Sequence, residues 1–103
     1  METLQQPIIW LSDLWNGKFP KVKPNVSSGA VRLRKACNRL GLRFVGDLLQ
    51  TPRHKLAEVK NFGDSSRERL EEVLASKGLA LEMPLPAELL AAYRDWKAKL
   101  PPN

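Results

Sequence analysis

The chain has 103 residues, which is enough for a single domain with one modest core. It carries 17 Lys and Arg against 11 Asp and Glu, and the formal net charge of +6 indicates an acidic partner such as nucleic acid. A single cysteine, Cys37, excludes a disulfide framework. With neither a long apolar run nor a signal-peptide start, the sequence predicts a cytoplasmic protein that does not span a membrane.

Residues 1–25 are predicted to form an N-terminal arm with little regular structure. The stretch from Ser12 to Trp15 allows one helical turn, which Asn16-Gly17 then breaks. Residues 18–24 alternate lysine, proline and apolar residues, a pattern that favours an extended backbone.

Three helices are predicted between residues 27 and 59. The first is capped by Ser27 or Ser28, runs through residue 40 on a helically spaced apolar face, and ends at Gly41. Cys37 falls on that apolar face and is predicted to be buried. A short helix then covers residues 45–50. Thr51 is a cap candidate and Pro52 the first helical position of a third helix, which runs to about residue 59.

A tight hairpin at Asn61-Phe62-Gly63 is predicted to open the next helix, which begins at Asp64 or Ser65 and runs to residue 77. Gly63 is expected at or near a positive φ, and Gly78 is a good residue to follow the helix end. A glycine hairpin at a helix start exposes backbone donors and the positive end of the helix dipole, which suits a phosphate. The pattern is a helix-hairpin-helix.

The last predicted helix, residues 87–100, follows Pro84 and Pro86 and is amphipathic. Because no strand alternation is convincing, the fold class is all-α: a compact four- to five-helix domain with helix-hairpin-helix units over residues 26–83, flanked by the arm (1–25) and the C-terminal helix (84–103). Eight side chains are predicted to be largely buried: Leu40, Leu48, Leu49, Leu56, Val59, Leu70, Val73 and Leu74.

Residues 26–83 also contain several short stretches that together match a known family. The spacing between Arg32, Gly46 and Gly63 fits that family without gaps. These stretches are Val31-Arg32, Gly41-Leu42, Val45 to Gln50, Asn61 to Gly63, Ser66, and Val73 to Leu81. In them the segment resembles the C-terminal domain of the bacterial RNA polymerase alpha subunit. That family folds as a compact helical domain, binds the DNA minor groove upstream of promoters and contacts activators. The resemblance therefore implies a DNA-binding, transcription-associated module whose other partners are RNA polymerase or a transcription regulator.

The resemblance also implies roles for particular residues. Arg32 matches the arginine that enters the minor groove, whereas Asn61, Gly63 and Ser66 match positions that contact the DNA backbone. Three further candidate DNA-binding residues depart from the family pattern: Lys35 replaces an asparagine, Ser65 a lysine and Arg69 an acidic residue.

Two other functions stay open. The first is a protein–protein adaptor that uses the same scaffold and binds polymerase or another assembly through its aromatic flanks, with Trp10, Trp15, Tyr93 and Trp96 as candidate partner-binding residues. The alternative for these aromatics is that the two flanks pack together and enlarge a small core. The second function is RNA binding, since a phosphate-holding hairpin does not by itself distinguish RNA from DNA.

No catalytic pattern is found in the sequence. It contains no paired-carboxylate motif, Walker loop, nucleophile elbow or metal-ligand cluster, and its one histidine, His54, is predicted to lie on the surface. We therefore expect a protein that is not an enzyme and needs no cofactor, metal or small-molecule substrate.

Overall fold

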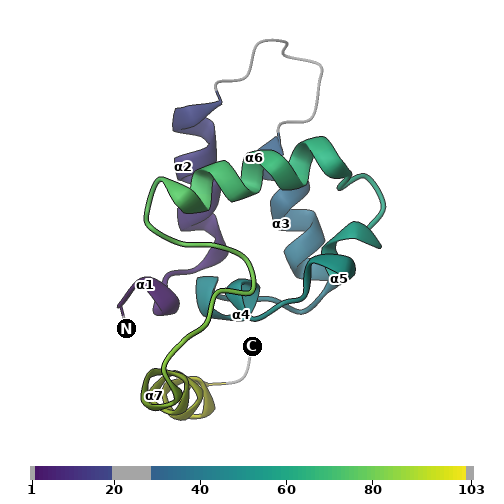
Figure 1. The fold of residues 1–103 in the computed structure, drawn as a ribbon. Helices are drawn as coiled ribbons and strands as arrows, with labels where there is room; N and C mark the ends of the chain where they lie inside the picture. Colours follow the sequence, from purple (N-terminus) through teal and green to yellow (C-terminus); the bar gives the residue numbers. More distant parts are fainter. Residues whose placement is uncertain (1, 20–28, 102–103) are drawn as a thin grey trace.

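The computed structural model describes residues 2–19 and 29–101, and over these residues the fold is all-α, as predicted (Figure 1). The only ladder contact among them is an isolated antiparallel bridge between Pro7 and Phe44. Four helices lie between residues 29 and 79, which confirms the expected number. The seven helices of the described part are α1 (Glu2–Gln5), α2 (Ile8–Lys18), α3 (Gly29–Arg39), α4 (Val45–Leu49), α5 (Arg53–Ala57), α6 (Asp64–Ala75) and α7 (Ala87–Ala98).

The N-terminal segment is helical, so the prediction of a mostly irregular arm is wrong. Helix α2 continues through Asn16 and Gly17, where a break was expected. The physical reason is burial, because Ile8, Leu11 and Trp15 recur at helical spacing and all lie in the core. Tertiary packing of this face outweighs the weak local preference of the Asn-Gly pair. The predicted extended segment lies largely outside the described residues, as do the cap candidates at positions 27 and 28.

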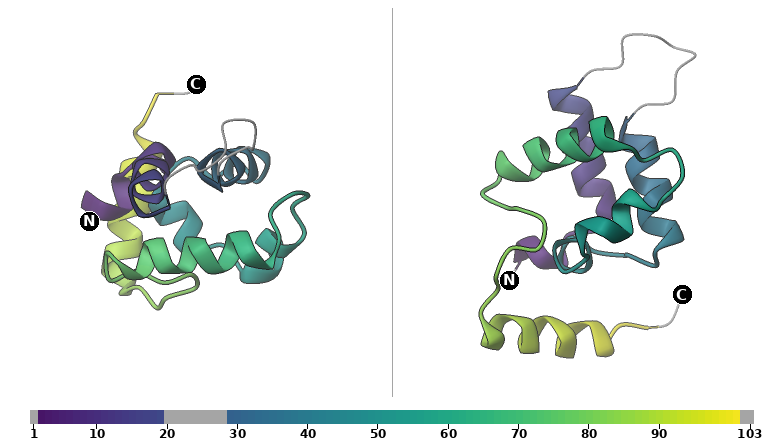
Figure 2. Two further views of the ribbon diagram at one scale, coloured as in Figure 1. Left: turned by 90° about the horizontal axis from the view of Figure 1, so that it is seen from above. Right: turned by 45° about the vertical axis from the view of Figure 1, so that its right-hand side comes forward.

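Helices α2 and α3 lie side by side, and α6 crosses them on one face (Figure 2). Together with α4 and α5 they enclose one core, to which α1 and α7 also contribute. Two of the eight side chains predicted to be buried, Leu40 and Val59, are only partly buried; the other six are fully buried. Among the described residues outside 26–83, the buried apolar side chains are Leu4, Ile8, Leu11, Trp15 and Tyr93.

Two glycines end helices as predicted. Gly41 has φ of 73° after α3, and the N–H of Leu42 donates to the carbonyl oxygen of Cys37 at 2.8 Å. Gly78 has φ of 71° after α6, and the N–H of Leu79 donates to the carbonyl oxygen of Leu74 at 2.9 Å. Both are the six-to-one hydrogen bond of a Schellman motif, which requires a left-handed residue that glycine adopts without strain.

The start of α5 differs from the predicted one. Pro52 is extended (φ −61°, ψ 144°) and precedes the helix, which begins at Arg53. The Thr51 hydroxyl does not cap α5, because it donates to the carbonyl oxygen of Asp47 at 2.9 Å and so satisfies the end of α4. The bend between α4 and α5 is therefore stabilised by a hydrogen bond to the end of α4 and not by a cap on α5.

Helix α7 is attached to the domain through the carboxylate of Asp47. Its Oδ2 accepts from the backbone N–H groups of Arg43 (3.0 Å) and Phe44 (3.3 Å), which fixes the start of α4. Its Oδ1 accepts from the Tyr93 hydroxyl (2.9 Å) and from the Lys97 ammonium (2.6 Å). Trp96 packs edge-on against Phe44, with ring centroids 4.8 Å apart. The predicted contact of Tyr93 and Trp96 with the main domain is confirmed.

The absence of a side chain at Gly46 leaves room for the Tyr93 ring. A Cβ atom at position 46 would lie 2.5 Å from Cζ of that buried ring. We predict that Gly46→Ala lowers the free energy of unfolding by about 1–3 kcal/mol, because the ring or the backbone must shift. Urea unfolding measures this. Gly17→Ala is the matched control: it has no atom within 4 Å of the added methyl and lies in a helix, so it should gain about 0.5–1 kcal/mol. Equal effects of the two substitutions would contradict the close packing of Tyr93 on Gly46.

The Asp47 contacts predict a pH dependence of stability. Burial by itself raises the pKa of this carboxyl, but hydrogen bonds from Lys97, the Arg43 backbone and Tyr93 outweigh burial and hold the pKa below its usual value. A carboxyl whose pKa is lowered by folding stabilises the protein above its unfolded pKa, near 3.9, and this stability is lost as pH falls through the folded pKa. Asp47→Asn should therefore cost about 1–3 kcal/mol at neutral pH and lose less stability than the wild type on acidification. Urea unfolding from about pH 7 to pH 3 tests both. The control, Asp95→Asn, removes an exposed pair with Lys99 and should change little.

Candidate nucleic-acid interface

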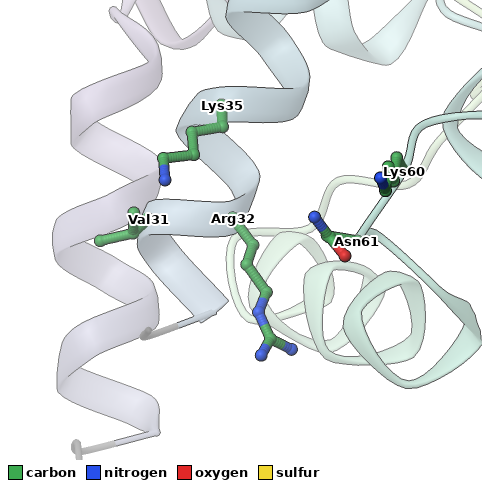
Figure 3. A pocket seen from close by; sticks show the side chains of 5 residues that line it. All are labelled: Val31, Arg32, Lys35, Lys60 and Asn61. Carbon is green, nitrogen blue, oxygen red and sulfur yellow. The ribbon is translucent and has the colours of Figure 1, made fainter. Parts of the chain in front are cut away.

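A pocket of about 280 Å³ lies between the first half of α3 and the loop that joins α5 to α6. Figure 3 shows Arg32 and Lys35 on α3, with Lys60 and Asn61 on the facing loop. Val31 completes the lining. Three cationic side chains and one amide thus surround a hollow without any acidic lining residue, and such a surface attracts an anion.

The two basic residues of α3 are exposed because the opposite side of that helix is buried. Ala30, Leu33 and Ala36 are at most 2% exposed and fix the rotation of α3 against its neighbours. Arg32 and Lys35 are three residues apart and so lie one above the other on the exposed side. The apolar pattern of α3 therefore presents both cations together.

The loop before α6 is anchored by Phe62, whose side chain is 1% exposed. With Phe62 inserted in the core, Lys60 and Asn61 on its N-terminal side stay exposed and face α3. Asn61 has φ of 68°, a left-handed conformation that asparagine tolerates better than most residues. The turn thus combines a buried aromatic anchor with two exposed polar side chains.

The prediction that Gly63 adopts a positive φ is wrong. Gly63 is extended (φ −85°, ψ −168°), and the left-handed position of the turn is held by Asn61 instead. Gly63 is the N-cap residue of α6, and its carbonyl oxygen accepts from the N–H of Arg67 at 3.0 Å. A Cβ atom at position 63 would meet nothing within 4 Å, so a side chain at this position would have room.

The other predicted residues of α6 point in different directions. Ser65 is exposed at the helix start, whereas Ser66 is 7% exposed and lies on the buried side. Arg69 is outside the pocket: its guanidinium lies over the Phe19 ring, 5.6 Å from the centroid. Asp64, beside the expected phosphate site, pairs with Arg67 at 2.9 Å.

The structure therefore brings together Arg32, Lys35 and Asn61, places Gly63 and Ser65 next along the sequence, and separates Ser66 and Arg69 from the pocket. Sequence reasoning did not include Lys60 among the candidate residues. Its position directly before Asn61, in a segment with eight basic and two acidic residues between 26 and 60, was the available signal.

The aromatic residues of the flanks contribute chiefly to the core. Trp15 and Tyr93 are each 1% exposed, whereas Trp10 and Trp96 are partly buried against the core. Cys37 is also buried, and burial raises the pKa of its thiol to about 12, which leaves it protonated and unreactive at neutral pH. Within residues 2–19 and 29–101, no group of three or more potential metal ligands occurs, and no helix is long and apolar enough to cross a bilayer.

Residues 30–76 match the family formed by the C-terminal domain of the bacterial RNA polymerase alpha subunit. This segment is an alpha C-terminal-domain-like domain. The match confirms the resemblance seen in the sequence, and it supports a transcription-associated role for this segment. It includes every residue that lines the pocket between α3 and the α5–α6 loop, and it leaves out α1, α2 and α7. No solved structure gave a significant match to this protein.

The turn before α6 predicts opposite effects at two neighbouring positions. Asn61→Val should cost about 1–2 kcal/mol, because a β-branched residue is strained at a positive φ. Gly63→Ser should leave stability unchanged or raise it by a few tenths of a kcal/mol, because serine is a good N-cap residue and the space is open. Thermal unfolding of the two variants, with Asn61→Gly as a strain-free control, measures this. A large loss for Gly63→Ser with Asn61→Val tolerated would reverse the two roles.

Proposed function

We propose that this protein binds double-stranded DNA through the pocket between α3 and the α5–α6 loop, as a module that acts in transcription. The observation that carries the proposal is the grouping of Arg32, Lys35, Lys60 and Asn61 around one hollow, inside the segment that matches the polymerase alpha family. In this proposal residues 26–83 are the DNA-binding domain, and helices α1, α2 and α7 from the flanks 1–25 and 84–103 complete its core.

Arg32 is the residue that enters the minor groove. A narrow minor groove has an enhanced negative potential that attracts arginine, and its base edges mainly distinguish A·T from G·C pairs. Lys35 and Lys60 lie on either side of the pocket and contact the phosphates that border the groove. Asn61 adds an amide to the lining of the same pocket, and this amide can donate to a phosphate or a sugar oxygen.

The start of α6 supplies a second set of phosphate contacts. Helix α6 has 12 residues and no side-chain cap at its N-cap residue Gly63, the space around Gly63 is open, and Ser65 is exposed in its first turn. The positive end of the helix dipole favours an anion there. The pairing of Asp64 with Arg67 reduces the repulsion that this carboxylate would otherwise exert.

A protein–protein adaptor on the same scaffold is the second candidate. It is favoured by the acidic residue at the start of α6 and by Ser65, which stands where the family usually has a lysine. RNA binding is a third outcome that the binding experiment distinguishes. In each case the proposal is a cytoplasmic, non-catalytic protein without a cofactor, whose partners are nucleic acid and the transcription apparatus.

The DNA proposal predicts a steep salt dependence. If about three to five phosphates are contacted, affinity for an AT-rich duplex should fall roughly 40- to 500-fold between about 50 and 200 mM salt. Arg32→Ala should weaken binding, flatten the salt slope by about one and reduce the preference for AT-rich over mixed duplex. Fluorescence anisotropy with both duplexes and a structured RNA measures these quantities.

Arg94→Ala is the matched control, since it removes the same charge from an exposed position on α7. It should leave duplex affinity within about twofold of the wild type. No duplex binding at low salt would refute the proposal, and tighter binding to the structured RNA would favour the RNA alternative.

A further inference from the structure

A second hollow lies on another face of α3 and is lined mainly by apolar groups. It has a volume of about 400 Å³ and is open to solvent. Pro7, Ile8 and Ile9 at the start of α2 form one wall. The other wall comes from the end of α3 and the turn into α4, with residues that include Cys37 and Phe44. We call this hollow the α2–α3 groove.

The two walls of the groove are joined through the backbone. The N–H of Ile8 donates to the carbonyl oxygen of Arg43 at 3.3 Å, and the N–H of Val45 donates to the carbonyl oxygen of Gln6 at 2.9 Å. The isolated bridge between Pro7 and Phe44 lies between these two hydrogen bonds. The groove is therefore preformed, and a ligand would not have to order its walls on binding.

The groove contains the most exposed large apolar side chain of the described residues. Ile9 is 51% exposed, and Leu42 and Phe44 beside it are only partly buried. A single exposed isoleucine is ordinary, but an exposed isoleucine that borders a hollow of this size with partly covered apolar neighbours is typical of a protein-interaction site. An open hollow cannot enclose most of a small molecule, so a protein segment suits it better.

The charge at the groove rim indicates which kind of protein segment would bind there. Arg34 and Arg43 both line the groove, and none of its nine lining residues is acidic. The Arg43 guanidinium lies over the Phe44 ring at 5.2 Å, which places the positive charge directly beside the apolar surface. A segment with a bulky apolar side chain flanked by Asp or Glu is therefore complementary to both parts of the groove.

The groove is separate from the proposed DNA site. Arg34 is two residues from Arg32, so the two side chains point roughly 200° apart around α3. The groove also depends on α2, which lies outside the family-matched residues 30–76. We propose that the α2–α3 groove is a docking site for an acidic protein segment that carries a large apolar anchor, and that it is used independently of DNA.

The test is a panel of fluorescent peptides of about 15 residues, each with Leu, Phe or Trp anchors at helical spacing and glutamates elsewhere. Matched controls replace the glutamates by lysine or the anchors by serine. We expect saturable binding of at least one acidic peptide at low salt, with at least tenfold loss on Ile9→Glu and on Arg34→Glu. Arg94→Glu, the charge-matched control on α7, should change the affinity less than twofold. Circular dichroism melts check that Ile9→Glu still folds, and Ile9→Ser is a second variant without an added charge.

Several results would overturn the proposal. They are no binding of any acidic peptide above the serine controls, equal binding of the lysine peptides, peptide binding that Ile9→Glu and Arg34→Glu leave unchanged, and displacement of the peptide by duplex DNA. Self-association that Ile9→Glu abolishes would also overturn it, since the occupant would then be a second copy of the same protein. Peptide binding that persists in Arg32→Ala separates this proposal from the DNA proposal.

Discussion

The carboxylate of Asp47 is the interaction on which the arrangement of the helices depends most. One oxygen closes the start of α4 through two backbone N–H groups, and the other holds α7 through Tyr93 and Lys97. The side chain of Asp47 is only 9% exposed, so its charge requires these four donors. Burial and the hydrogen bond to Asp47 raise the pKa of Tyr93, which keeps its hydroxyl protonated as a donor. A single buried charge thus connects the central helices with the C-terminal flank.

The flanks are part of the fold because they fill space that the central segment leaves open. Tyr93 occupies the place where residue 46 lacks a side chain, and Trp15 does the same at Gly29, where a Cβ atom would lie 2.3 Å from the indole ring. Both aromatics come from outside residues 30–76. A domain of this size buries a limited apolar area, and each large aromatic adds about 1.5–3 kcal/mol of burial.

Most of the central fold could be predicted from the sequence because helix ends at glycine and helically spaced apolar residues depend on neighbouring residues only. Gly41 and Gly78 end helices as expected, since a Schellman turn depends on one residue's conformation. The prediction for position 63 is wrong because asparagine also adopts the left-handed region, so the sequence of the turn does not indicate which of its residues does so. Helix α2 was not predicted because the Asn16-Gly17 pair was read as a break, whereas packing of the helically spaced Ile8, Leu11 and Trp15 outweighs that pair. Of the residues predicted to bind DNA, Arg32, Lys35 and Asn61 line one pocket, whereas the place of Lys60 beside them and the burial of Ser66 required the structure.

The separation in sequence of the Asp47 partners has a consequence for how the protein folds during synthesis. Tyr93 and Lys97 are 46 and 50 residues beyond Asp47. The residues of α4 are therefore synthesised well before the two side chains that donate to the Asp47 carboxylate. Until they emerge from the ribosome, Gly46 lacks the Tyr93 ring that packs on it, and α4 can be held only by its other neighbours, such as α1. Closing so long a loop adds an entropic cost and slows folding relative to a bundle of local contacts. The set of hydrogen bonds around Asp47 is therefore complete only after translation has passed residue 97, so α7 is the last element to join the fold.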